Sequence, residues 1–252
     1  MRRRRILIVN PNSSPLVTEI LAREARRLVG EAAEIDAVTA PFGSASLECR
    51  AELVIAAHAV LQAIADASDF DAAVIGAFGD PGLEAAREIT AAPVFGLGRS
   101  GLAAAGAEAR RFAIVTLGER MAGEIENMID ARGWRRQCVA IRFLAGAVLD
   151  VSRERAQFME AMAAAARDCV RETGAEAVLF GGAPFAGAAR ELAGRLAIPV
   201  FDGLASAIED AMRAPMRGTA VPAPKAGNAE KASVGVAEPL ATRIHEFLSR
   251  RD

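Results

Sequence analysis

Two glycine-rich loops are the parts of this 252-residue chain best suited to hold and activate a small molecule. Residues 76–82 (GAFGDPG) follow one apolar run, and residues 181–184 (GGAP) follow another. Each context predicts a strand, a tight turn and then a helix. Ligands bind at the carboxyl ends of strands in α/β sheets because loop N–H groups and helix N-termini converge there. The two loops therefore predict two half-sites that face each other.

The backbone of both loops is suited to stabilise negative charge on a ligand oxygen. In the first loop, Phe78, Gly79 and Asp80 are expected to offer N–H groups to an oxyanion. One such donor typically contributes about 10²–10³ in rate. Asp80 also fits a second role, as the N-cap of the helix that follows. The corresponding binding loop of the second pattern consists of Gly181, Gly182, Ala183 and Pro184.

Polar side chains at other strand ends are further candidates for ligand binding. After the first predicted strand come Asn10, Asn12, Ser13 and Ser14, which either hold a carboxylate or cyclic imide or form a turn and helix N-cap. Thr116 occupies the position of Asn10 in the second copy of the pattern. Asp202 follows the last predicted strand and either reaches the cleft or caps the next helix.

The loops belong to a pattern of strands and helices that occurs twice. Ile6 and Phe112 are 106 positions apart, as are Pro93 and Pro199, and each pair begins or precedes an apolar run. This duplication predicts an α/β fold of two pseudo-symmetric, doubly wound domains with parallel sheets and a cleft between them. The predicted strands are 5–10, 34–39, 72–77, 93–97, 111–116, 138–144, 177–181 and 199–203, and the predicted helices are 16–30, 49–68, 82–90, 119–133 and 152–173.

The domain boundaries follow from the same pattern. We expect a first half made of residues 1–98 plus 204–213 and a second half made of residues 99–203. Residues 214–238 contain prolines, glycines and many alanines with few large apolar residues, which predicts a flexible linker. Residues 239–252 predict a short amphipathic helix.

Composition excludes several classes of function. A net charge of −2 and the absence of tyrosine argue against nucleic acid as a partner. Cys49, Cys138 and Cys169 are widely spaced, and only His58 and His245 could assist them, so no metal site is expected. The apolar runs are too short for a signal sequence or a membrane span, which favours a cytoplasmic protein without a membrane partner.

Three segments together resemble the aspartate/glutamate/hydantoin racemase superfamily, in particular its hydantoin and allantoin racemase branch. They are residues 6–14 (ILIVNPNSS), 78–83 (FGDPGL) and 199–203 (PVFDG), and the resemblance spans about residues 5–210. It implies a homo-oligomeric isomerase that acts on a small molecule in a site between two domains, without cofactor or metal. It also implies two cysteines, which remove and return a proton on opposite faces of the substrate's acidic carbon.

This chain departs from that pattern at both cysteine positions. The resemblance places the thiols at Ala77 and at Gly182, and neither residue can titrate. The nearest carboxylates, Asp80 and Asp202, are then the candidates for acid/base groups. We therefore expect a racemase or epimerase that acts on a small amino-acid-derived or hydantoin-like compound without the cysteine pair. The alternatives are a related hydrolase, lyase or decarboxylase with the same oxyanion site, and a non-catalytic metabolite-binding protein.

Overall fold

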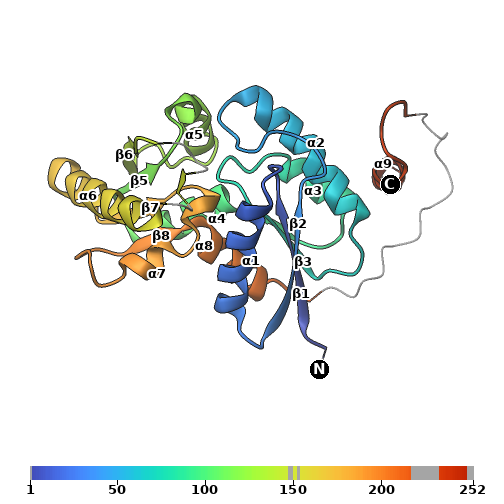
Figure 1. Cartoon of the computed structure of the whole chain (residues 1–252), viewed down its shortest axis with the longest axis horizontal. Coiled ribbons are helices and arrows are strands. Elements are labelled where there is room, and N and C mark those ends of the chain that lie inside the picture. The colour runs from blue at the N-terminus through green and yellow to red at the C-terminus, as the bar shows by residue number, and fades with distance from the viewer. Residues whose placement is uncertain (1, 147–149, 152–153, 217–232, 249–252) are drawn as a thin grey trace.

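Two parallel four-stranded sheets form the frame of the molecule, one in each half (Figure 1). The computed structural model describes residues 2–146, 150–151, 154–216 and 233–248. The first sheet has the order β2-β1-β3-β4 and the second the order β6-β5-β7-β8. The strands are β1 (Arg4–Asn10), β2 (Ala33–Thr39), β3 (Ala72–Ile75), β4 (Val94–Gly96), β5 (Phe112–Thr116), β6 (Cys138–Phe143), β7 (Ala177–Phe180) and β8 (Val200–Asp202).

The two sheets share one topology, and their central strand pairs share one register, which confirms the predicted fold class. Ile6 of β1 pairs with Ala72 of β3, and Phe112 of β5 pairs with Ala177 of β7. The central strands are apolar throughout because both of their faces are covered, as is usual for parallel sheets. Alternate residues of β1 accordingly enter two different core clusters, one on each face.

Helices cover both faces of each sheet. On the first sheet, α1 (Pro15–Val29) and α8 (Gly203–Arg213) pack on one face. The other face carries α2 (Arg50–Asp66), α3 (Leu83–Ile89) and α9 (Glu238–Leu248). The second sheet packs against α4 (Leu97–Glu108), α5 (Ala122–Asp130) and the short η1 (Glu119–Met121) on one face, and against η3 (Ala183–Phe185), α6 (Arg155–Thr173) and α7 (Ala188–Leu192) on the other.

The helix α4 was not among the predicted elements. It follows directly from β4 of the first sheet and packs on β7 and β8 of the second, while α8 leaves β8 and packs on β3 and β4. Each helix thus leaves the sheet of one half and packs on the sheet of the other, and the two helices contact each other. The predicted domain boundaries stay a prediction, and residues 217–232 of the predicted linker and 249–252 of the terminal helix lie outside the described residues.

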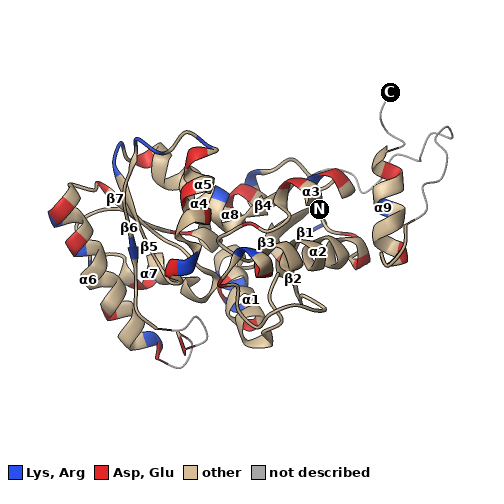
Figure 2. Cartoon of the chain, turned by 90° about the horizontal axis from the view of Figure 1, so that it is seen from above, with Lys and Arg blue, Asp and Glu red and all other residues tan. Residues whose placement is uncertain are grey.

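The surface carries charges of both signs. Figure 2 shows acidic and basic positions interspersed along the elements of both halves. None of the described helices combines the length and the apolar character needed to cross a membrane. Near the carboxyl end of the described chain, α9 lies against α2 and α3 and buries Leu240 in the core of the first half.

Candidate functional site

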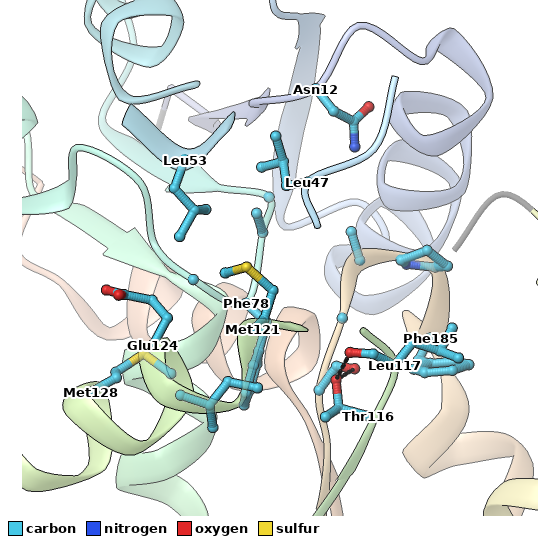
Figure 3. A pocket seen from close by; sticks show the side chains of 18 residues that line it. Asn12, Leu47, Leu53, Phe78, Thr116, Leu117, Met121, Glu124, Met128 and Phe185 are labelled. Carbon is cyan, nitrogen blue, oxygen red and sulfur yellow. Dashed lines mark hydrogen bonds between the residues drawn. The ribbon is translucent and has the colours of Figure 1, made fainter. Parts of the chain in front are cut away.

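A cavity of about 90 Å³ lies between the two halves, at the carboxyl ends of the strands. Both glycine loops contribute to its wall, as the sequence led us to expect (Figure 3). Most of the remaining wall is apolar, which is typical of small-molecule sites. Its lining residues are Asn12, Leu47, Leu53, Gly76, Ala77, Phe78, Gly79, Thr116, Leu117, Met121, Glu124, Ile125, Met128, Gly181, Gly182, Ala183, Pro184 and Phe185.

The predicted site residues divide into two groups. Those that line the cavity are Asn12, Phe78, Gly79, Thr116, Gly181, Gly182, Ala183 and Pro184. Those that do not line it are Asn10, Ser13, Ser14, Asp80 and Asp202. The roles of the first group in binding stay predictions, and in the second group the hydrogen bonds of Asn10, Asp80 and Asp202 show what these side chains bind instead.

Asn10 holds the first loop in shape. Its buried Nδ2 donates to Asn12 Oδ1 (2.9 Å), to the Ser14 carbonyl (3.0 Å) and to Thr18 Oγ1 (3.0 Å). Asn12 Oδ1 also accepts from the Ser14 N–H, so two donors fix the orientation of the Asn12 amide. Asn12 Nδ2 has no acceptor in the part of the chain that the structure describes. The loop thus presents one amide donor at the cavity wall.

Backbone N–H groups of both glycine loops supply further donors. Within the described residues, the N–H groups of Ala77, Phe78, Gly79 and Gly182 have no protein acceptor. The Asp80 N–H, in contrast, donates to the Ala77 carbonyl at 3.1 Å, which corrects the expectation that Asp80 offers its N–H to a ligand. Unpaired donors from two sides of one cavity are suited to hold a ligand oxygen that carries negative charge.

The Asp80 carboxylate caps a helix, but not the one that follows it in sequence. It accepts hydrogen bonds from the N–H groups of Gly98 (2.8 Å) and Arg99 (2.6 Å) at the start of α4. Burial raises the pKa of Asp80 to about 7, although both hydrogen bonds and the nearby Arg132 guanidinium act to lower it. Asp80 is therefore a positioning residue that fastens the first glycine loop to α4.

Asp202 is the N-cap of α8. Its Oδ1 accepts from the Ala205 N–H at 2.9 Å, and its Oδ2 accepts from the Ala189 N–H at 3.3 Å. Burial raises the pKa of this carboxyl too. Both carboxylates proposed from the sequence as acid/base groups thus lie outside the cavity wall and serve helix N-termini.

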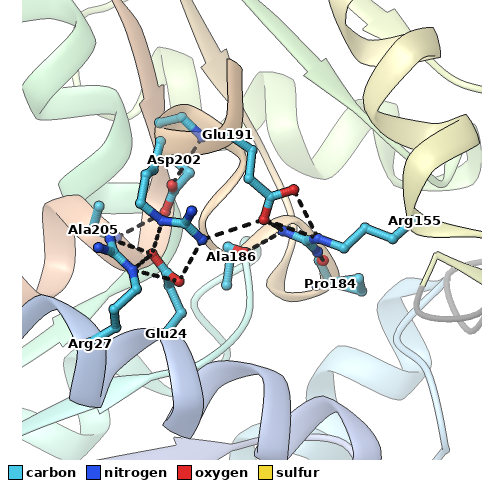
Figure 4. A network of polar contacts seen from close by, with 10 residues as sticks. Glu24, Arg27, Arg155, Pro184, Ala186, Glu191, Asp202 and Ala205 are labelled. Atoms are coloured by element: carbon cyan, nitrogen blue, oxygen red, sulfur yellow. Dashed lines mark hydrogen bonds and ion pairs between the residues drawn. The ribbon is translucent and has the colours of Figure 1, made fainter. Parts of the chain in front are cut away.

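The second glycine loop is held from two sides. Thr116 Oγ1, buried at the end of β5, donates to the Gly181 carbonyl at 2.9 Å. Arg155 donates to the carbonyls of Pro184 (3.0 Å) and Ala186 (2.8 Å) and pairs with Glu191 (Figure 4). These contacts fix the direction in which the loop meets the cavity.

The same network joins the two halves. Glu24 of α1 accepts from Arg27 and from Arg190 of the second half, and Arg190 also reaches Glu191 (Figure 4). Burial of the Glu24 carboxylate acts to raise its pKa, but the hydrogen bonds from Arg27 and Arg190 outweigh burial, so its pKa lies below the usual value. The ionised carboxylate is thus the form that the folded protein favours.

Replacing Glu24 with glutamine should therefore destabilise the folded protein by roughly 1–2 kcal/mol near neutral pH, because charge-assisted hydrogen bonds are lost. The difference from wild type should disappear as the pH falls below the ordinary carboxyl range, since the lowered pKa stabilises only the ionised form. Urea unfolding at several pH values measures this. Glu209→Gln, which breaks an exposed pair with Arg213, is the control and should stay within about 0.5 kcal/mol of wild type.

Glu124 is the functional candidate that sequence reasoning missed. Among the lining residues it has the one side chain that ionises. It lies on α5, and its Oε2 pairs with Nε of Arg50, the first residue of α2 in the other half, at 3.2 Å. By the 106-residue offset Glu124 corresponds to Thr18 on α1, which belongs to none of the motifs, so the sequence held no signal for it.

The cysteines and His58 lie away from the cavity wall. Cys49 is exposed before α2, and Cys138 and Cys169 belong to β6 and α6. Burial raises the pKa of the Cys138 thiol to about 11 and also raises that of Cys169. Among the described residues, no cluster of three or more His, Cys, Asp or Glu side chains is placed to hold a metal ion.

Comparisons with known proteins agree with this arrangement. A model of the Asp/Glu/hydantoin racemase family matches residues 6–211. A hydantoin racemase of Pseudomonas sp. (strain NS671) is 32% identical over 207 residues, which cover 81% of this chain and 83% of that protein.

Two solved structures are similar in fold over most of both chains. The allantoin racemase from Klebsiella pneumoniae has a TM-score of 0.80 and 31% identity, covering 82% of this chain and 86% of that one. The allantoin racemase from Pseudomonas fluorescens has a TM-score of 0.78 and 29% identity, covering 89% and 100%.

Proposed function

Since this chain belongs to the Asp/Glu/hydantoin racemase family, we propose that it binds a small amino-acid-derived or hydantoin-like compound in the cavity between its halves. The resemblance noted in the sequence is confirmed by this membership. One observation carries the proposal. The unpaired donors of both glycine loops and the Asn12 amide lie at a cavity whose remaining wall is mostly apolar. Such a site fits a ligand with carbonyl oxygens and an apolar substituent.

The chemistry in this proposal is cofactor-independent activation of a carbon next to a carbonyl group, without the two-cysteine pair. Loop N–H groups would stabilise the enolate-like oxygen that forms when the neighbouring proton leaves. Ala77 and Gly182 occupy the positions to which the resemblance assigns thiols, so inversion would need acid/base groups of another kind. Homo-oligomerisation and a cytoplasmic location also remain proposals for this chain.

A second candidate is a reaction that needs an acid/base group on one face only, such as an elimination or a decarboxylation. The observation that favours it is the single ionisable side chain among the lining residues. Inversion at carbon requires a base on one face and an acid on the other. A site with one such group is better suited to chemistry on one face.

The binding proposal is tested by titrating a panel of 5-substituted hydantoins, open-chain ureido acids and amino acids, with binding followed by calorimetry and NMR shifts. Asn12→Asp is the diagnostic variant, because its carboxylate still accepts from Asn10 and Ser14 while the donor at the cavity wall is lost. We expect affinity to fall by about 10-fold or more, the effect of one lost donor plus charge repulsion of a carbonyl oxygen. Ser13→Ala, outside the cavity wall, should bind as wild type does. If no member of the panel binds, the proposal is wrong.

A further inference from the structure

We propose that Glu124 is the catalytic acid/base residue of this cavity and that it transfers protons on one face of the ligand only. This inference rests on the proposed function, because it assumes that a compound with an acidic C–H group binds between the halves. It assigns a role to a residue of α5 that neither the glycine loops nor the positions of the missing thiols would indicate.

The position of Glu124 supports this role. Figure 3 shows Glu124 and Met128 on one side of the cavity, and Thr116 and Phe185 on the other. The Glu124 side chain is 34% exposed, so it is reachable by solvent as well as by a ligand. Its Oε2 is paired with Arg50, whereas its Oε1 has no partner in the described part of the chain. One oxygen is thus held and the other is available to accept a proton.

The other candidate acid/base side chains make different contacts. The carboxylates of Asp80 and Asp202 each accept two backbone hydrogen bonds at helix N-termini. His58 stacks edge-on against Phe42 with ring centroids 5.1 Å apart and does not line the cavity. Glu124 is therefore the group from which proton transfer inside the cavity can be expected.

Arg50 acts as a positioning residue in this scheme. It belongs to the first half and Glu124 to the second, so their ion pair crosses the cleft. The Arg50 side chain is 64% exposed, and an exposed pair of this kind contributes only about 0–1 kcal/mol to stability. Its value to the protein therefore lies in orienting the Glu124 carboxylate rather than in stabilising the fold.

The proposed step conserves atoms and charge. Glu124 Oε1 takes the proton from the acidic carbon, and the C–H electron pair moves into the carbon–carbonyl bond to give an enolate. The enolate oxygen accepts hydrogen bonds from the loop N–H groups. The Glu124 carboxylic acid then exchanges its proton with solvent and returns one to the same carbon from the same side. The net result is isotope exchange with retained configuration, because no second group delivers a proton to the opposite face.

The test uses single enantiomers of 5-benzylhydantoin and 5-isobutylhydantoin in D₂O near neutral pH, with an enzyme-free blank for spontaneous exchange. Deuterium uptake is followed by NMR and configuration by chiral chromatography. Wild type should exchange one enantiomer without converting it to the other. Glu124→Gln should lose about 10²-fold or more of this exchange, the usual contribution of a general base, while its affinity stays within about threefold.

Glu126→Gln is the matched control, because Glu126 lies on the same helix and pairs with Arg135 outside the cavity wall. It should exchange as fast as wild type. Arg50→Gln should slow exchange by about 2–10-fold, and Arg50→Lys should recover part of that loss if Arg50 orients the carboxylate. Exchange that survives in Glu124→Gln, or inversion catalysed by wild type, would overturn the inference.

The two proposals fail in distinguishable ways. Binding of a hydantoin without deuterium uptake overturns the role of Glu124 and leaves the binding function intact. The lack of any binding overturns both. Exchange with retained configuration that depends on Glu124 supports both.

Discussion

Replacing Gly98 with alanine is expected to lower the free energy of unfolding by about 3 kcal/mol or more and to abolish ligand binding. A Cβ atom at position 98 would lie well under 3.0 Å from the Phe78 carbonyl oxygen and under 3.0 Å from the Met128 sulfur. The methionine side chain can move, but the carbonyl belongs to the backbone of the first glycine loop. The loop would have to leave α4, which would displace the Phe78 and Gly79 N–H groups and the hydrogen bond from the Gly98 N–H to Asp80.

Gly101→Ala provides the control for this prediction, since it adds the same methyl group one turn further along α4. Its closest neighbour would be the end of the Leu179 side chain, which can rearrange. Alanine also favours helix by up to about 1 kcal/mol over glycine, so Gly101→Ala should stay within about 1 kcal/mol of wild type. Urea unfolding of both variants measures the difference. Equal stability of the two variants would contradict the close packing of α4 beneath the loop.

These glycines also explain why α4 was not predicted. Its sequence, LGRSGLAAAGAE, contains three glycines, which lower helix propensity and obscure any apolar periodicity. Gly98 is required because α4 lies close to the backbone carbonyl of Phe78, a residue distant in sequence. Tertiary packing therefore overrides local propensity here, and only the three-dimensional structure shows it.

The predictions of the fold from the sequence depend on the repeat. Apolar runs buried on both faces, and matching offsets such as Ile6 with Phe112, were enough to predict two parallel sheets and a cleft with two glycine loops. The repeat does not predict in which direction a side chain points. Asp80 stands beside the predicted site in sequence, yet its left-handed backbone (φ 46°) turns the carboxylate toward α4. Glu124 is far from any motif and reaches the cavity only because α5 packs beside it.

The backbone of the second glycine loop is unfavourable for the thiol that the resemblance assigns to position 182. Gly182 has φ 124° and ψ 139°, a backbone region that residues with a Cβ rarely enter and that costs them about 1–3 kcal/mol. Ala77 has no such restriction, since its φ is not positive. A cysteine would thus fit the first position as the loop stands but would strain the second. The proposed proton transfer by Glu124 on one face requires a thiol at neither position.

In wild type, the titration of Asp80 should make the free energy of unfolding vary by several kcal/mol with pH. Asp80→Asn should remove this variation. The pKa of Asp80 is about 7 in the folded protein and 3.8 in an unperturbed chain. Between these values the folded state binds more protons than the unfolded state, so the free energy of unfolding of wild type falls as the pH rises from about 4 to about 7. Each unit of pKa difference corresponds to about 1.4 kcal/mol. The stabilisation from the raised pKa is complete below pH 3.8 and is lost above pH 7.

Asparagine cannot titrate, so the free energy of unfolding of Asp80→Asn relative to wild type should rise steadily over that pH range and level off above it. A constant penalty of about 1–2 kcal/mol is expected in addition, because the asparagine amide can accept only one of the two N–H groups of Gly98 and Arg99. Glu84→Gln is the control and should keep the wild-type pH dependence, because Glu84 is a neighbouring exposed carboxylate paired with Arg99.

Denaturant unfolding at half-unit pH steps separates the pH-dependent change from the constant penalty. Parallel curves for wild type and Asp80→Asn would mean that this carboxyl does not hold its proton in the folded protein. If the curves diverge, the carboxyl that joins the first glycine loop to α4 changes its charge near neutral pH. Ligand affinity should then change over the same pH range in wild type but not in Asp80→Asn.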